Sequence, residues 1–484
     1  MLASAFFLGA ATVLAFSPAG VYPLSLVTFA LLVHMWRAAA PRRAFWLGYA
    51  FGLGLFGAGV SWIYVSLHTF GDMPLPLAAL ATFLFCAFLA LFTAAAGWLQ
   101  ARIPAAPAVR ACLLIPAAWV LFEWLRSWIF TGFPWLSVGY AAVGWPIQGF
   151  APLLGVFGLS FLTISLAGMA WLVVRQRSTR FALGLIVILA AGEALRHVPW
   201  SEPFGEPVSA ALLQGNIAQD LKFRPERYPP ILETYARLAQ ASAAKLIVLP
   251  ETAIPRFYDR IEPEYVALLE AVAKRNGGDL LLGVPYRTNG GEYFNSVLSL
   301  GSSARQAYHK SHLVAFGEFI PPGFGWVLRI LNIPLSDFSR GSIEQPPIAA
   351  AGQRVAVNVC YEDVFGDEIA RRLPAATLLV NMSNVAWFGD SLAPAQHLQI
   401  ARLRAAETGR MHLAATNTGI TAAIDRDGRV LARLPQFSEG RLEVLAQGYS
   451  GATPYSRYRD WPVVVVSLLV LAFATFIAHR ALSR

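Results

Sequence analysis

Three titratable residues follow short apolar runs in the stretch from residue 198 to residue 460. Glu251 ends LIVLPE, Lys310 ends RQAYHK and Cys360 ends VAVNVC. In α/β proteins the groups at strand ends converge on a common crevice. A carboxylate there can take the proton of a thiol, and an ammonium can stabilise the oxyanion that forms when the sulfur attacks a carbonyl. The three residues therefore predict a site for covalent catalysis by cysteine.

The residues after Cys360 bear on its charge state. Tyr361, Glu362 and Asp363 follow it directly, and nearby carboxylates favour a protonated thiol. Alternate residues diverge along an extended run, so these carboxylates could point away from the sulfur. The sequence leaves their orientation open, and Glu362 could equally pair with a nearby arginine.

The elements that would position these residues alternate between short β-rich runs and helical stretches from residue 208 onward. Runs such as LIVLPE, LLLGVPYR and TLLVNMSN are almost continuously apolar, which is typical of sheets covered on both faces. GSS at 301–303 and Asp-Gly at 427–428 predict hairpin turns. We therefore expect a layered α/β domain.

The rest of the chain is too apolar for a soluble protein. Of the 484 residues, 56% are hydrophobic and 14% are charged, and a membrane-crossing helix needs about 20 mostly apolar residues. We expect a membrane domain over 1–197, the α/β domain over 198–460, and a last crossing with a short tail over 461–484. Eight transmembrane helices are expected, near 2–16, 21–36, 44–67, 75–99, 110–128, 156–174, 180–196 and 461–481. The first two are short, so they could form a hairpin instead.

Basic residues of the apolar segments gather in alternate loops. The loops at 37–44, 100–110 and 175–180 and the tail at 479–484 carry arginine, whereas the opposite loops FSPAG and HTFGDMP carry no Lys or Arg. Because cytoplasmic loops carry the excess of positive charge, both termini are expected in the cytoplasm. The 198–460 domain would then lie outside it.

The same loops account for the basic balance of the chain. Ten arginines border the apolar segments, and taking them from the net charge of +9 leaves −1. The charge thus reflects topology, and no nucleic-acid partner is expected. The ten are Arg37, Arg42, Arg43, Arg102, Arg110, Arg175, Arg177, Arg180, Arg480 and Arg484.

Cysteine usage gives no disulfide framework. Cys86 and Cys112 lie in expected crossings, where a small buried hydrophobe is the simpler interpretation. Cys360 then has no partner in its own domain and remains a free thiol.

Two aromatic segments have two interpretations each. Residues 126–155 could be an interfacial aromatic belt, or a re-entrant segment that lines a path for lipid. Residues 319–338 could be a buried connection, or an apolar arm that admits lipid to the site.

At the three titratable residues the sequence resembles the carbon–nitrogen hydrolase (nitrilase) superfamily, whose Glu-Lys-Cys triad has the same chain order, each member at a strand end. Over its full length the chain resembles the apolipoprotein N-acyltransferases of that superfamily. One residue departs from the expected pattern, since Ala315 stands where we expect Pro. The matching stretches are FTGFPW (130–135), ALLQGNIAQDLKF (211–223), LPETAIP (249–255), YHKSHLVAFGEFIP (308–321), CYED (360–363), NMSNVAWFGDSLAPAQHLQIARLRAAETGR (381–410) and ATNTGITAAID (415–425).

This resemblance implies a nitrilase-like αββα sandwich and a role for each site residue. Glu251 would be the general base, Lys310 the residue that stabilises the oxyanion, and Cys360 the nucleophile. Glu318 would be a supporting acidic residue. The other residues implied are Tyr361 and Glu362, which would shape the site, and Trp387 and Phe388, which would lie on a mobile loop beside the acyl chain.

The resemblance also implies the reaction and its partners. An acyl chain would pass from a phospholipid, typically phosphatidylethanolamine, to Cys360 and then to the α-amine of the diacylglyceryl-cysteine of an apolipoprotein. No cofactor or metal is expected, because a thioester reacts with amines without further activation. The enzyme is expected to be a monomer in the bacterial inner membrane, with its catalytic domain on the periplasmic side.

Two other functions remain open at this point. A membrane-tethered amidase would carry the same triad and would resolve its thioester with water. A non-catalytic lipid-binding protein could carry a vestigial domain of this kind, although all three triad residues are retained.

Overall fold

The chain folds into two compact units. The computed structural model describes residues 1–320 and 337–482. The helical unit comprises Met1–Tyr64, Leu75–Val198 and Tyr458–Arg484, and the α/β unit comprises Val65–Pro74 and Pro199–Arg457. The expected arm at 319–338 lies almost wholly outside the described residues.

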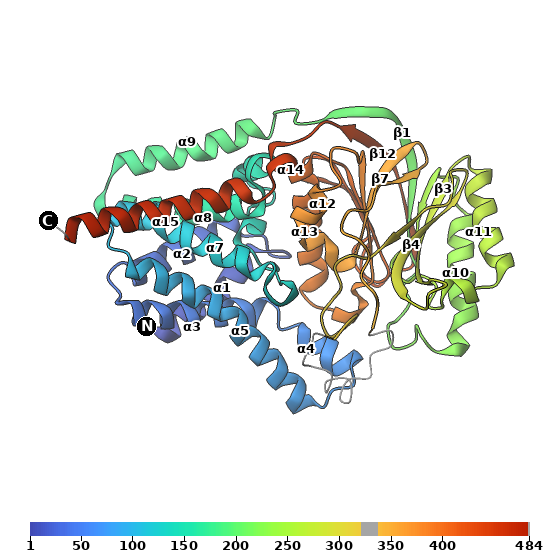
Figure 1. Ribbon diagram of the computed structural model, residues 1–484, viewed down its shortest axis with the longest axis horizontal. Helices are drawn as coiled ribbons and strands as arrows, with labels where there is room; N and C mark the ends of the chain where they lie inside the picture. The colour runs from blue at the N-terminus through green and yellow to red at the C-terminus, as the bar shows by residue number, and fades with distance from the viewer. Residues whose placement is uncertain (321–336, 483–484) are drawn as a thin grey trace. The chain divides into compact units, whose positions relative to one another are not determined.

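Apolar helices that lie side by side make up the helical unit (Figure 1). Four helices among the described residues are long and apolar enough to cross a membrane, namely Leu75–Arg102, Pro107–Arg126, Pro146–Gln176 and Trp461–Arg480. Its main helices are α1 (Leu2–Thr12), α2 (Tyr22–Trp36), α3 (Pro41–Gly59), α5 (Leu75–Arg102), α7 (Ile115–Arg126), α8 (Ala151–Gln176), α9 (Thr179–Leu195) and α15 (Trp461–Leu482).

The expected number of eight crossings is not confirmed. The helices at the expected crossings 2–16, 21–36 and 180–196 have 11, 15 and 17 residues, and a crossing takes about 20.

The expected crossing at 44–67 is broken. Helix α3 ends at Gly59, and the helical stretch Ile63–Phe70 continues at an angle of 56°. Glycine is unfavourable for continuing a helix, and the Trp62 indole donates a hydrogen bond to the Gly59 carbonyl at 3.1 Å. The chain therefore turns at this point, and Val65–Pro74 belongs to the α/β unit.

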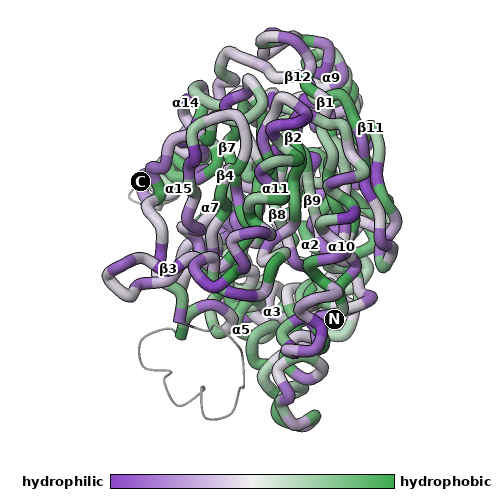
Figure 2. Tube along the Cα trace, turned by 90° about the vertical axis from the view of Figure 1, so that its right-hand side faces the viewer, coloured by the Kyte–Doolittle hydropathy of each residue, from purple (hydrophilic) through white to green (hydrophobic). Residues whose placement is uncertain are grey.

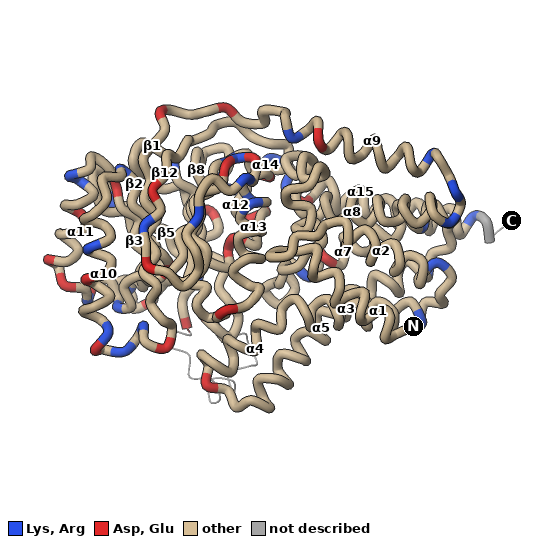
Figure 3. The backbone as a smooth tube through the Cα atoms, turned by 180° about the vertical axis from the view of Figure 1, so that it is seen from behind, with Lys and Arg blue, Asp and Glu red and all other residues tan. Residues whose placement is uncertain are grey.

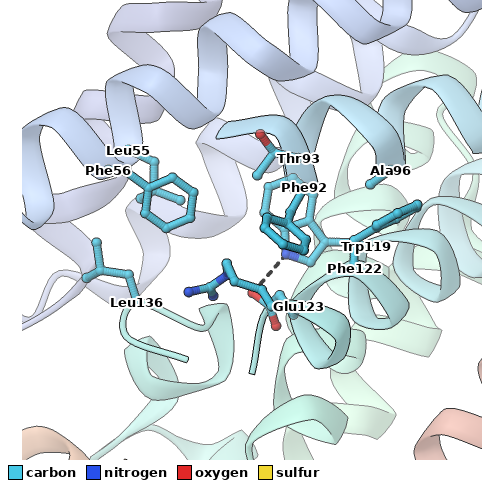
Figure 4. Close-up of a pocket in the computed structure, with 10 residues that line it drawn as sticks. Leu55, Phe56, Phe92, Thr93, Ala96, Trp119, Phe122, Glu123 and Leu136 are labelled. Atoms are coloured by element: carbon cyan, nitrogen blue, oxygen red, sulfur yellow. Dashed lines mark hydrogen bonds between the residues drawn. The ribbon is translucent and has the colours of Figure 1, made fainter. Parts of the chain in front are cut away.

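Most of the aromatic segment 126–155 packs inside the helical unit. Arg126 donates hydrogen bonds to the carbonyls of Phe133 and Trp135. Glu123 accepts the Trp119 indole N–H, the hydrogen bond dashed in Figure 4, and also the Val138 N–H; both distances are 2.9 Å. The buried side chains of Glu123 and Arg126 thus hold the segment in place. Trp128 and Phe130 are exposed, but most of the segment is not a surface belt.

Charged residues are distributed differently in the two units. Figure 3 shows Lys and Arg at the end of the helical unit that carries both chain termini, while the lengths of its helices are almost free of charge. In the α/β unit charges of both signs lie on helices such as α10 (Tyr228–Gln240) and α11 (Pro263–Arg275). This pattern in the helical unit matches the arginine-rich loops of the sequence.

The α/β unit contains two six-stranded sheets. The first has the order β12-β1-β2-β3-β4-β5 and the second β11-β10-β9-β8-β7-β6. In each sheet three central strands are parallel, β1-β2-β3 and β7-β8-β9. The strands are β1 (Glu202–Gln214), β2 (Leu246–Val248), β3 (Asp279–Arg287), β4 (Tyr293–Gly301), β5 (Ala307–His309), β6 (Ile348–Ala350), β7 (Gln353–Val359), β8 (Leu378–Ser383), β9 (His412–Thr416), β10 (Ala422–Ile424), β11 (Val430–Arg433) and β12 (Gly440–Ser450).

Helices cover the outer faces of the two sheets. Helices α10 and α11 lie on one side, and α12 (Gly366–Ala370) and α13 (Ala393–Thr408) lie on the other, as Figure 1 shows. Alternate residues of each central strand enter different cores: Leu212 faces the second sheet, while Leu213 packs against α10. Hydrophobic residues accordingly follow the central strands in Figure 2. The predicted sandwich with helices on both outer faces is confirmed.

Candidate active site

Each residue of the predicted triad follows a strand. Glu251 comes after β2, Lys310 directly after β5, and Cys360 directly after β7, where the turn Cys360–Val364 begins. Cys360 has a φ of 53°, a conformation that a non-glycine residue adopts at a cost and that recurs at sharp turns carrying nucleophiles. The Asn381 side chain donates a hydrogen bond to the Cys360 carbonyl at 3.1 Å and so holds this turn.

The side chains of the three residues meet in one buried cluster. Lys310 Nζ lies 3.3 Å from Glu251 Oε1. The Cys360 thiol is a hydrogen-bond partner of the Glu251 carboxylate, and its sulfur lies in the field of Lys310. Lys310 is 1% exposed and Glu251 is 7% exposed, so water screens their interaction weakly.

The environment keeps Glu251 ionised and Cys360 protonated. Burial opposes the charged form of Glu251, yet Lys310 and the hydrogen bond from Asn295 outweigh it and hold the pKa of this carboxyl below its ordinary value. Burial raises the pKa of the Cys360 thiol, and the Glu251 charge raises it further. Burial alone would lower the pKa of Lys310, but Glu251 and Glu318 raise it.

These shifts define the resting state as a thiol, a carboxylate and an ammonium. Because the thiol pKa is raised, a free thiolate is not the resting form. The sulfur must lose its proton as it attacks, and the ionised Glu251 is the adjacent group that can take it. Lys310 keeps its proton and can donate to a developing oxyanion.

Glu318 belongs to the same cluster. Its carboxylate lies 2.8 Å from Lys310 Nζ and accepts the Val314 N–H at 2.9 Å. The Asn295 amide donates to both Glu251 and Glu318, at 2.8 Å each. Glu318 and Asn295 therefore fix the position of Lys310 and the distance between the two carboxylates.

Glu362 binds the backbone beside two of the triad residues. Its carboxylate accepts the Ser311 N–H and the Val359 N–H, both at 2.7 Å, and the Tyr308 hydroxyl at 2.8 Å. The carboxyl thus links the turn after Lys310 to the turn of Cys360. Its arginine contact is indirect, because Arg372 donates to the Tyr308 hydroxyl at 2.8 Å.

The other two residues of CYED, Tyr361 and Asp363, contact neighbouring side chains. Asp363 is fully buried and accepts a hydrogen bond from His412 Nε2 at 3.0 Å. The Tyr361 ring contacts the rings of His312 and Phe365. The carboxylates that raise the pKa of the thiol are Glu251 and Glu318, which come from elsewhere in the chain.

Glu362→Gln is expected to lower stability and slow the reaction together. The amide leaves at least one of the buried N–H donors without an acceptor, a loss of about 1–3 kcal/mol. Thermal unfolding of the purified full-length protein checks this, with the exposed Glu344→Gln as the matched control. An unchanged unfolding midpoint in Glu362→Gln would contradict a linking role for this carboxyl.

Trp387 and Phe388 lie on a short turn after β8, Val385–Phe388. The Ser66 hydroxyl donates to the Trp387 carbonyl at 2.7 Å, and the Phe70 ring contacts the Trp387 ring at 6.1 Å between centroids. The turn is thus held by the segment Val65–Pro74. A role beside an acyl chain stays a prediction.

The sequence patterns missed several polar residues of the site. Asn384 lies one residue after β8; its N–H donates to Glu251 Oε2 at 2.8 Å and also lowers the pKa of the Cys360 thiol. Asn295 and Lys222 were missed as well. A polar residue inside an apolar strand was a signal for Asn295, and the rarity of lysine was one for Lys222. Among the described residues, no group of three His, Cys, Asp or Glu side chains is arranged to hold a metal ion.

The class of protein follows from the fold and from two family models. The model described as carbon-nitrogen hydrolase matches residues 209–454. The model described as apolipoprotein N-acyltransferase N-terminal domain matches residues 8–169. The α/β unit is thus a nitrilase-like carbon–nitrogen hydrolase domain.

Curated relatives match the chain over almost its whole length. It is 50% identical to the apolipoprotein N-acyltransferase of Nitrosomonas europaea, over 99% of this chain and 98% of the relative. It is 46% identical to that of Methylococcus capsulatus, over 93% and 91%, and 43% identical to that of Chromobacterium violaceum, over 99% and 94%. The chain belongs to the apolipoprotein N-acyltransferase family.

Proposed function

We propose that this protein transfers an acyl chain from a phospholipid, through a thioester on Cys360, to the α-amine of the diacylglyceryl-cysteine of an apolipoprotein. The observation that carries the proposal is the buried cluster of Glu251, Lys310 and Cys360 in a chain that also has membrane-length apolar helices. The donor is proposed to be phosphatidylethanolamine.

In the first step the Cys360 sulfur attacks the sn-1 ester carbonyl of the donor. Glu251 takes the thiol proton, and Lys310 donates a hydrogen bond to the oxyanion. The C–O bond to the glycerol then breaks, and Glu251 returns the proton to the leaving alkoxide. The products are a Cys360 thioester and a lysophospholipid, and no further reactant is required.

In the second step the α-amine of the acceptor attacks the thioester carbonyl. Glu251 accepts a proton from the amine nitrogen, the C–S bond breaks, and the sulfur regains a proton. The product is an N-acylated lipoprotein, and the thiol is regenerated. Burial of Glu251 and Lys310 limits the access of water, which favours aminolysis over hydrolysis.

The proposal extends to the arrangement in the membrane. Eight crossings over residues 1–197 and 461–484 would place both termini in the cytoplasm and the domain 198–460 in the periplasm of a bacterial inner membrane. The arginine-rich loops support this orientation. One copy of the chain is sufficient, because one α/β unit supplies all three triad residues.

The proposal is tested by a two-stage experiment. Full-length protein is incubated in vesicles of phosphatidylethanolamine without acceptor, and mass spectrometry of the Cys360 peptide is expected to show an added acyl group. A diacylated lipopeptide with a free α-amine is then added. The thioester should disappear as an equal amount of N-acylated peptide forms, and an N-acetylated lipopeptide serves as the control.

The two alternatives give different outcomes in the same experiment. Release of free fatty acid without N-acylated peptide would support the membrane-tethered amidase. Absence of any acyl group on Cys360 in the first stage would refute a covalent mechanism and favour a lipid-binding role.

A further inference from the structure

Lysine is rare in this chain, and half of its lysines are buried at one place. The sequence has 38 Lys and Arg residues, of which only Lys222, Lys245, Lys274 and Lys310 are lysine. Lys245 and Lys274 are exposed, whereas Lys222 is 2% exposed and Lys310 is 1% exposed. Arginine supplies nearly all other positive charge. Lysine at the buried positions 222 and 310 therefore indicates that an ammonium group is needed there.

Lys222 lies in the turn after β1, next to the catalytic base. Its Nζ donates to the backbone carbonyl of Glu251 at 3.3 Å. The turn is held in place, because Asn384, whose N–H binds the Glu251 carboxylate, donates its side-chain amide to Gln219 at 2.8 Å. A fixed loop thus delivers this ammonium to the interior of the site.

The contacts of Lys222 do not explain its burial as a structural feature. An ammonium has three donors, and the hydrogen bonds of the described residues give Lys222 one acceptor, a neutral carbonyl. Burying a charge with so little compensation is costly. The compensation comes from charge, since Lys222 lies in the field of the ionised Glu251 carboxylate and beside the Cys360 sulfur, which becomes negative only as it attacks.

We propose that Lys222 is a second positive positioning residue of the acyl transfer reaction, acting through Glu251 to stabilise the negative charge that passes from this carboxylate to the Cys360 sulfur and the oxyanion. The inference rests on the proposed function and deepens it. Lys310 shares its charge between Glu251 and Glu318. The two carboxylates and Lys310 alone carry a net charge of −1, and Lys222 brings the cluster to zero.

The charge of Lys222 is also poised to change near neutral pH. Burial lowers its pKa to about 8, while the negative charge of Glu251 opposes the shift. The other charged groups of the cluster are Lys310 and Glu318, and Lys310 keeps its proton over this range because its pKa is raised. Below pH 8 Lys222 is therefore positively charged and speeds acylation of Cys360. Above pH 8 the charge is lost and the rate should fall.

The test follows the rate of Cys360 acylation in a single turnover, by mass spectrometry of full-length protein in phosphatidylethanolamine vesicles from pH 6 to pH 10. The wild-type rate should fall on the alkaline side of pH 8. Lys222→Met and Lys222→Gln should both react about 10- to 100-fold more slowly at pH 7. Their profiles should lack the alkaline fall.

The variants separate charge from hydrogen bonding and from folding. Gln can still donate to the Glu251 carbonyl, so recovery of the rate in Lys222→Gln would overturn the electrostatic role. Lys245→Met, which removes an exposed lysine of the same unit, should match the wild type. Thermal unfolding identifies a variant that fails to fold. In that case the pH profile of the wild-type acylation rate alone tests the inference.

Each remaining outcome is decisive. A wild-type rate that does not fall between pH 7 and pH 9, or a slowed Lys222→Met that keeps the wild-type alkaline fall, would overturn the inference. A wild type that forms thioester normally, with Lys222→Met equally fast, would overturn it and leave the proposed function standing. A wild type that forms no thioester at all would overturn both.

Discussion

Cys360→Ala is expected to reduce acyl transfer to the background rate, a loss on the order of 10⁶-fold. A thioester requires a sulfur atom, which Cys360 supplies in this cluster, and Lys310 holds its proton and so has no lone pair for attack. Mass spectrometry after incubation with phospholipid should show no acyl group on the 360 peptide. Acyl label that persists in this variant would refute the assignment of the nucleophile.

Cys360→Ser is the matched control for this result. It keeps an attacking atom of similar position, but a hydroxyl is a weaker nucleophile than a thiol, and an oxygen ester is less reactive towards amines than a thioester. An ester should therefore form slowly and persist after the lipopeptide is added. Cys112→Ala, in the helical unit, should leave both steps unchanged.

The convergence of Glu251, Lys310 and Cys360 could be predicted from the sequence, because each residue follows a predicted strand and the resemblance to the nitrilase superfamily picks out all three. Glu251 and Cys360 each follow a strand that is almost wholly buried, as expected of strands covered on both faces, and Lys310 follows the short strand β5. The layered sandwich could be predicted because the strands are nearly continuous apolar runs. Such runs arise where alternate residues of a strand, as in β1 and β8, enter two different cores.

The orientation of Glu362 could not be predicted from the rule for extended strands. The chain leaves the extended conformation at Cys360, whose φ is 53°, and a tight helical turn follows. Glu362 is thereby turned towards the N–H groups of Ser311 and Val359. The alternation of side chains holds only within a strand, and β7 ends at Val359, before Glu362 is reached.

The polar residues that complete the site lay beyond local patterns for a different reason. Lys222, Asn295 and Asn384 reach Glu251 from a turn after β1, from the interior of β4 and from the turn after β8. Nothing in their own sequence neighbourhood fixes these contacts, because the packing of two sheets brings the segments together.

Glu251→Gln is expected to slow acylation of Cys360 by about 10²- to 10⁴-fold, the usual contribution of a general base. The amide oxygen can still accept the hydrogen bonds of Lys310 and Asn295. The Asn384 N–H loses its acceptor, so thermal unfolding should show a fold that persists with a stability lowered by about 1–3 kcal/mol. What is lost is the group that takes the thiol proton. The rate of the variant should rise with pH, because hydroxide then supplies the thiolate.

The same substitution should make the thiol easier to ionise while the enzyme becomes slower. The negative charge of Glu251 raises the pKa of Cys360, so its removal should move the midpoint of iodoacetamide alkylation to lower pH, read on the Cys360 peptide apart from Cys86 and Cys112. A lower alkylation midpoint together with slower acyl transfer distinguishes a general base from a residue that only supports the fold. Misfolding would slow acyl transfer without a defined shift of the alkylation midpoint. A midpoint that stays in place or moves to higher pH would show that the thiol proton is not controlled by Glu251.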